Sequence, residues 1–177
     1  SRSRRALAGL LACGLLATLA AALAHPAAAP AKHGLLTGFA DTARYQSSDP
    51  TERATWLDRT LEARAGIVRL DLSWGGVAAS QRPPDPTNPG SASYDFSRID
   101  AAVRDAEARG LVVLLLINGA PAWAEAPGRP PSAAPGTWKP SPSDLADFMR
   151  AVAARYSGGF DPDGPGPAPP LPAVQAL

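Results

Sequence analysis

The sequence predicts an α/β protein with a parallel sheet, and three observations lead to this fold class. Residues 67–73 and 111–117 are short apolar or alternating runs of the kind that form strands. Each run follows a segment in which apolar residues recur at helical spacing, and a glycine separates the two. Long loops rich in proline and glycine come after the strands. In parallel α/β folds, the loops on that side carry the active site.

The first expected strand covers residues 35–39, and a helix follows it. Asp49 is suited to cap this helix, because Pro50 then takes the first helical position and Glu52 falls where a capping box has its glutamate. Alanine and leucine recur at helical spacing beyond the cap, and we expect Gly66 to end the helix.

The second strand, residues 67–73, reads Ile-Val-Arg-Leu-Asp-Leu-Ser and is the most informative stretch. Alternate side chains of a strand share a face, so Val68 and Leu70 point one way while Arg69 and Asp71 point the other. Charged side chains are rarely buried unless they are paired or functional. The strand therefore predicts a polar site on one face of the sheet.

Two further helices and one more complete strand are expected downstream. Ser97 can cap a helix that Gly110 closes, and the strand at residues 111–117 is apolar on both faces, as a buried parallel strand is. Ser141 begins another helix, and residues 173–177 resemble the opening of a fourth strand.

Residues 1–31 are interpreted as a signal peptide and linker, which leaves 34–177 as the folded part. Arginines precede an unbroken alanine- and leucine-rich run, and small residues at 22–24 and 29–31 offer cleavage sites. The protein is therefore expected to be secreted, with no stable membrane span after cleavage. A retained membrane anchor is the competing interpretation, since the apolar run could just cross a bilayer.

Composition argues against several classes of partner. The net charge is +1, without the basic excess of a nucleic-acid-binding protein, and the single cysteine cannot form an internal disulfide. His25 and His33 lie in the linker, and residues 161–164 lack the remaining ligands of a calcium loop. No phosphate-binding glycine loop or nucleophile elbow is present. We therefore expect no metal and no cofactor.

Four stretches, taken in order and spacing, carry a resemblance to a known family. They are residues 65–74 (Ala-Gly-Ile-Val-Arg-Leu-Asp-Leu-Ser-Trp), 94–100 (Tyr-Asp-Phe-Ser-Arg-Ile-Asp), 108–114 (Ala-Arg-Gly-Leu-Val-Val-Leu) and 120–124 (Ala-Pro-Ala-Trp-Ala). The chain from about residue 34 onward resembles the N-terminal part of the (β/α)8-barrel glycoside hydrolases, the clan of cellulase-like family 5 and xylosidase-like family 39. The resemblance implies an incomplete TIM barrel with about its first three strand–helix units.

The resemblance also implies a carbohydrate substrate and roles for particular residues. Arg69 matches an arginine that supports the nucleophilic glutamate in the clan; its alternative is an ion pair with Asp71. Trp74 and Trp123 match aromatics that stack on sugar rings, but either one can instead pack under the loops. Asn118 can bind a sugar hydroxyl or satisfy loop amides.

In the clan, the catalytic glutamates lie at the ends of strands four and seven, the first within an Asn-Glu motif. This chain has no such motif, and Glu125 is its only glutamate in a loop on the expected side. We therefore expect no catalytic residue of the pair in this chain. A complete barrel needs about 250 residues, against 177 here.

The expected function is a part of a secreted glycosidase that hydrolyses O-glycosyl bonds of a polysaccharide or glycoconjugate with retention, using glutamates beyond this chain. One alternative is a non-catalytic carbohydrate-binding or cell-surface module that uses Trp74, Trp123 and Trp138 as a platform. Another is a small open α/β enzyme acting through Asp71 and Glu125.

Overall fold

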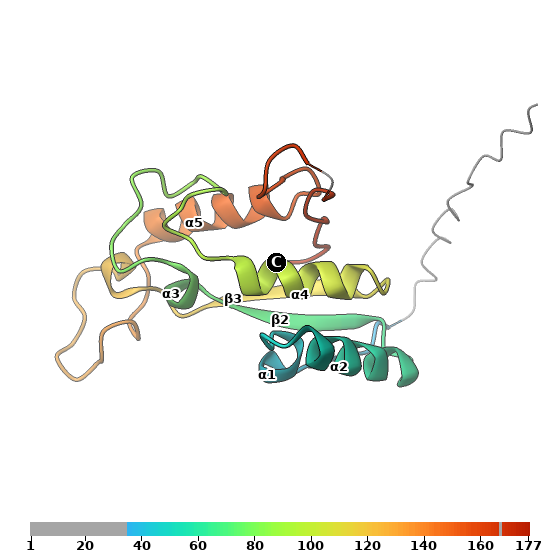
Figure 1. Cartoon of the computed structure of the whole chain (residues 1–177). Coiled ribbons are helices and arrows are strands. Elements are labelled where there is room, and N and C mark those ends of the chain that lie inside the picture. Colours follow the sequence, from blue (N-terminus) through green and yellow to red (C-terminus); the bar gives the residue numbers. More distant parts are fainter. Residues whose placement is uncertain (1–34, 167) are drawn as a thin grey trace, which may run out of the picture. The chain divides into compact units, whose positions relative to one another are not determined.

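A computed structural model describes residues 35–166 and 168–177 (Figure 1). The expected signal peptide and linker at 1–31, and the two histidines, lie outside the described residues. In chain order the elements are β1 (Gly38–Ala40), α1 (Thr42–Tyr45), α2 (Pro50–Glu62), β2 (Ile67–Ser73), α3 (Trp74–Val77), α4 (Ser97–Glu107), β3 (Val112–Asn118), the 3-10 turn η1 (Ala122–Ala124) and α5 (Pro142–Arg155).

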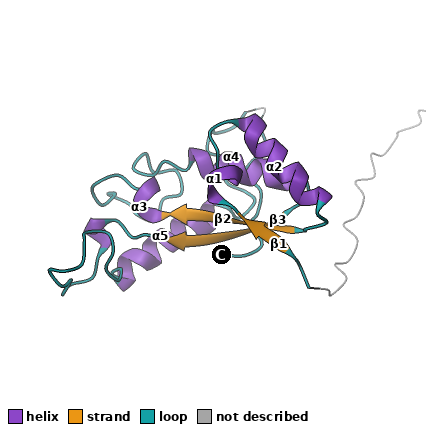
Figure 2. Ribbon diagram, turned by 90° about the horizontal axis from the view of Figure 1, so that it is seen from below, coloured by secondary structure: helices purple, strands orange, loops and turns teal. Residues whose placement is uncertain are grey.

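The strands form one parallel sheet in the order β1–β2–β3, which confirms the α/β class and the parallel sheet. Figure 2 shows the three arrows side by side and pointing in roughly the same direction. The segment expected to open a fourth strand extends this order, because Ala176 forms a parallel bridge with Leu114 and its carbonyl accepts from the Leu115 N–H at 3.1 Å. Neighbours in the sheet are thus neighbours in the sequence.

The first strand is shorter than expected and begins at Gly38 rather than at residue 35. Leu35 and Leu36 are 93% and 59% exposed, so they have no packing partner to hold them in the sheet. Gly38 approaches β2 so closely that a Cβ there would lie 2.0 Å from the Ile67 carbonyl oxygen. Only glycine fits this position, and pairing starts there because the strands can meet.

The helix starts agree closely with the sequence, whereas one helix end does not. Asp49 caps α2 by accepting from the Thr51 N–H at 2.8 Å, as expected. The helix ends at Glu62, however, and Arg64 takes the left-handed conformation with φ 59° that glycine usually supplies. Gly66 instead donates its N–H to the Thr37 carbonyl and leads into β2. The expectation that Gly66 ends the helix was wrong for this reason.

The two later helices begin close to where the sequence placed them. Ser141 accepts from the Asp144 N–H and caps α5. At α4 the serine is the first helical residue rather than the cap, and Asp95 accepts from the Ser97 N–H at 3.1 Å. Gly110 has φ 72°, which confirms it as the residue that closes the α4 region before β3.

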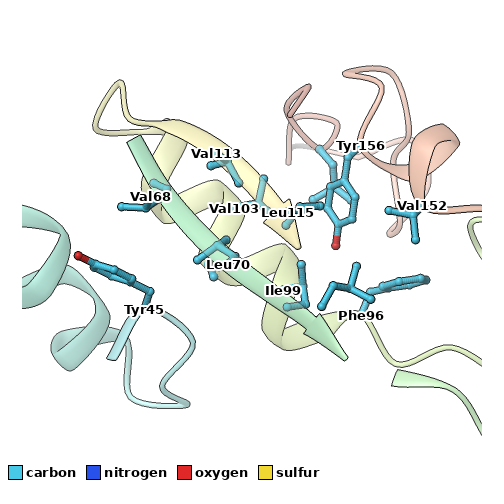
Figure 3. Packing of buried hydrophobic residues seen from close by; sticks show 14 of the residues in the cluster. Tyr45, Val68, Leu70, Phe96, Ile99, Val103, Val113, Leu115, Val152 and Tyr156 are labelled. Carbon is cyan, nitrogen blue, oxygen red and sulfur yellow. The ribbon is translucent and has the colours of Figure 1, made fainter. Parts of the chain in front are cut away.

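The core lies on one face of the sheet only. Val68 and Leu70 from β2, and Val113 and Leu115 from β3, are at most 1% exposed. They share one apolar cluster with side chains from α2, α4 and α5, including Leu57, Val103 and Val152 (Figure 3). The opposite face, which we call the open face, carries Ile67, Arg69, Asp71, Val112, Leu114 and Leu116. Strand β3 was expected to be buried on both faces, but Leu116 is 43% exposed.

The part of the chain from 35 onward that the structure describes includes no helix with the length and apolar character needed to cross a bilayer.

Candidate functional site

A polar group of side chains, the Asp71 cluster, lies toward the carboxyl end of β2 and consists of Thr42, Gln46, Arg69 and Asp71. The Asp71 carboxylate accepts from Thr42 Oγ1 at 2.7 Å and from Arg69 Nε at 3.1 Å. Gln46 holds the Asp71 backbone on both sides, donating to its carbonyl at 3.0 Å and accepting from its N–H at 3.2 Å. The cluster ties the segment after β1 to β2 and fixes the orientation of the carboxylate.

A cavity of about 300 Å³ opens beside the Asp71 cluster. Ser73, Asp95 and Arg98 complete its polar lining. Arg98 donates to the Gln46 carbonyl at 2.9 Å, and hydrogen bonding from Ser97 lowers the pKa of Asp95 below its ordinary value. The cavity thus combines carboxylate acceptors with hydroxyl and guanidinium donors. A ligand with several hydroxyl groups matches this mixture of donors and acceptors.

Arg69 lies on the open face, as the alternation of β2 predicted. Its side chain is 43% exposed, and that of its partner Asp71 is 23% exposed. The ion pair with Asp71 that the sequence offered as one alternative is therefore present. A second acceptor for the guanidinium is still compatible with this geometry, because Nε alone is the atom that bonds to Asp71.

Trp74 and Trp123 come together, but not as an exposed platform. Trp74 is 1% exposed and stacks on Phe148 with ring centroids 4.7 Å apart. Trp123 meets it edge-on at 5.7 Å and donates its Nε1–H to the Ala79 carbonyl at 3.0 Å. Packing beneath the loops, the alternative to sugar stacking, is the arrangement that these contacts describe. Trp123 remains half-buried, whereas Trp74 presents no exposed ring face.

A second cavity of about 290 Å³, the tryptophan cavity, lies past the carboxyl end of β3. Asn118 lines it from the strand and Trp74 from α3, while Gly136 and Trp138 line it from the loop that precedes α5. Asn118 is exposed and therefore free to meet a ligand at this mouth. The structure brings Asn118 and Trp74 into one cavity and leaves Arg69 outside its lining.

Glu125 is occupied within its own loop. Its side chain is 7% exposed and forms an ion pair with Arg129 at 3.1 Å. One carboxylate oxygen accepts from the Gly136 N–H at 2.7 Å and from the Trp138 N–H at 3.0 Å. Such contacts close the loop after β3 and leave little of the carboxylate available for proton transfer, so its position is that of a loop-holding residue.

The sequence missed Thr42 and Gln46, which the fold brings to Asp71. Both lie in or directly after the short helix α1, in a region that the sequence left without an element. Polar residues in such a segment are ordinary by composition, and their partner lies 25 or more positions away. The only local indication was Asp41, which caps α1 by accepting from the Arg44 N–H.

No model of a known protein family matches the chain, and a search of curated proteins found no match either. In the portion that the structure describes, there is also no group of three or more histidine, cysteine, aspartate or glutamate side chains placed to hold a metal ion.

Proposed function

We propose that residues 34–177 form part of the catalytic (β/α)8 barrel of a secreted glycoside hydrolase. The enzyme would cleave O-glycosidic bonds of a polysaccharide or glycoconjugate with retention of configuration. Arg69, Asn118 and Trp123 would belong to its substrate end, and the two catalytic glutamates would come from sequence outside this chain. The observation that carries the proposal is the one-sided sheet: consecutive strands are parallel neighbours, with helices packed on one face and Arg69 and Asp71 on the other.

The one-sided sheet supports a barrel wall because a barrel has all its helices outside and all its inward-facing side chains on the opposite face. A doubly wound sheet would need helices on both faces. The apolar residues of the open face, such as the 43% exposed Leu116, are also suited to contact further barrel side chains. The bridge at Ala176 extends the sheet in the direction that a fourth parallel strand takes.

The chemistry of the Asp71 cluster supports the assignment of the substrate end. In retaining glycosidases, the nucleophile is a carboxylate about 5 Å from the acid/base carboxyl group. An arginine beside the nucleophile keeps it ionised and oriented. Arg69 presents a guanidinium on the open face, already held at Nε by Asp71. Its remaining N–H groups are the donors that an incoming carboxylate needs.

The test begins with the coding sequence that follows the codon of Leu177. We expect it to continue in frame and to encode a strand that ends in Asn-Glu. The whole encoded protein should then release sugar from chromogenic glycosides, and NMR of the first-formed anomer should show retention. A stop codon directly after Leu177, or a whole protein inactive on a broad glycoside panel, would overturn the proposal.

A matched pair of arginine variants sharpens this test. Arg69→Met should lower kcat/KM by about 100-fold, the cost of removing one donor to a catalytic charge. Arg150→Met is the control, because Arg150 also pairs with an aspartate but is 66% exposed on α5. Its rate should stay within about twofold. Equal rates for the two variants would remove Arg69 from the substrate end.

A further inference from the structure

Two buried hydrogen-bond donors line the tryptophan cavity without a partner. The indole N–H groups of Trp74 and Trp138 are shielded from solvent, and neither has an acceptor among the described residues. The indole N–H of Trp123, close by, is satisfied by the Ala79 carbonyl at 3.0 Å. A buried tryptophan N–H normally finds a partner, because leaving one unsatisfied costs about 1–3 kcal/mol. Two such groups on one cavity therefore call for an explanation.

The lining of the tryptophan cavity is poor in acceptors. Indole N–H groups only donate, and the lining includes no aspartate or glutamate. The hydroxyl of Thr137 already donates to the Ala134 carbonyl, and the Gly119 carbonyl accepts from the Gly75 N–H. Among the described residues, the side chain of Asn118 remains as an adjustable polar group of the lining. The cavity is thus complementary to a group that accepts hydrogen bonds and donates none.

Charge near the tryptophan cavity favours an anion. The Lys139 Nζ lies 5.5 Å from the centre of the Trp138 ring. The nearest carboxylate of the same loop, Glu125, is neutralised by Arg129 at 3.1 Å and engaged by two backbone N–H groups. Apolar surface from Ile117 and Leu145 lines the remaining wall. A cavity of about 290 Å³ is at the small end of the range for ligand sites.

We propose that the tryptophan cavity binds the carboxylate of a small organic acid. The two carboxylate oxygens accept from the indole N–H groups of Trp74 and Trp138, and Lys139 supplies the balancing charge. A carboxylate is the one common biological group with two acceptor oxygens and no donor. The proposal does not depend on glycoside hydrolysis, because it concerns binding by residues of this chain alone.

The test uses the full chain with its tryptophans labelled with 15N. Its four tryptophans give four indole signals, which single Trp→Phe variants assign. Sodium glucuronate and sodium benzoate are titrated in, with glucose as the neutral match for glucuronate. We expect the signals of Trp74 and Trp138 to move with at least one acid, while those of Trp56 and Trp123 stay in place. Benzoate alone would indicate an apolar acid, and glucuronate alone an acidic sugar.

Variants then separate the donor from the ring. Trp138→Phe keeps an aromatic ring without the N–H and should weaken acid binding about tenfold, as expected for a lost bond to a charged group. Lys139→Gln should weaken the acids too. Trp56→Phe is the control, because Trp56 lies on α2 and lines a different cavity. Its affinity should match the wild type.

Two results would overturn the carboxylate site. The first is a shift of the Trp74 and Trp138 signals with glucose that equals the shift with glucuronate. The second is no shift with either acid, which would assign the two N–H groups to water. Both results can be read from the wild-type chain, so they do not depend on how a variant folds. Hydrolysis by the whole protein without acid binding would leave the proposed function standing, and acid binding without hydrolysis would leave this inference standing.

Discussion

On one face of the sheet Leu115 is 1% exposed, whereas Leu116, the next residue of the same strand, is 43% exposed on the other face. The two faces also contain one arginine–aspartate pair each. Arg155 and Asp100 join α5 to α4 over the covered face, with side chains 8% and 13% exposed. Arg69 and Asp71 lie on the open face, with side chains 43% and 23% exposed. The covered face is built for stability, and the open face keeps charge and apolar surface available.

The covered pair is embedded in further contacts. Arg155 Nε donates to Asp100 at 2.9 Å and Tyr156 donates to the same carboxylate at 2.8 Å, while the guanidinium lies 4.6 Å from the centre of the Phe96 ring. Burial raises the pKa of Tyr156 above its ordinary value, so its hydroxyl stays a donor at any ordinary pH. The same residue types therefore do different work on the two faces, because the solvent around them differs.

The largest expected effect comes from breaking the covered pair. Arg155→Met should lower the free energy of unfolding by about 3–5 kcal/mol, because it leaves Asp100 buried without its counter-charge. Urea denaturation followed by circular dichroism measures this. Arg150→Met, on the same helix but 66% exposed, should change it by less than about 1 kcal/mol. Equal losses for the two variants would contradict the contrast between buried and exposed pairs.

The second prediction compares neighbouring leucines of β3. Leu115→Ala should cost about 2–5 kcal/mol, since it leaves a cavity in the core. Leu116→Ala should stay within about 0.5 kcal/mol, as substitutions on exposed surface do. Both values come from denaturant midpoints at constant slope. A large loss for Leu116→Ala would mean that the open face is packed in solution.

The third prediction concerns acid. A hydrogen bond from Arg82 at 2.8 Å holds the pKa of Asp144 below its ordinary value. A carboxyl group whose pKa is lowered on folding stabilises the protein above its unfolded pKa, and this stabilisation is lost as the pH falls through the folded value. Thermal stability should therefore decline below about pH 4. Arg82→Gln should make that decline shallower; an unchanged pH profile would exclude the contact as its cause.

The smallest expected effect is on the open face. A double-mutant cycle with Arg69→Met and Asp71→Asn should give a coupling free energy of about 0.2–1 kcal/mol, typical of exposed pairs. Guanidinium chloride screens charge, so urea is the denaturant of choice. A coupling of several kcal/mol would show that the pair is shielded in solution and that the open face is covered there.

Local patterns in the sequence located most of the elements. The caps at Asp49 and Ser141 and the closing glycine Gly110 depend on contacts within a few residues, and each was identified correctly. The alternation in β2 correctly assigned Leu70 to the core and Arg69 to the other face. Helix and strand periodicity need no knowledge of distant neighbours, which is why these predictions succeeded.

The candidate site was harder to predict because its contacts are long-range. Trp74 has the composition of a sugar-stacking residue, but Phe148 stacks on it from a helix far along the chain. Glu125 looked like a free loop carboxylate, yet Gly136 and Trp138 donate to it. Neither partner could be foreseen, since the loop that returns to Glu125 has no periodicity of its own.

By itself the sequence determined the strands, the helices and which strand residues face each way, because steric preference, capping and alternation act over a few residues. Tertiary structure decided which charges are buried, which tryptophans stay reachable and which donors lack a partner. Those properties depend on how closely distant segments approach, and burial sets the strength of every polar contact through the solvent that it removes.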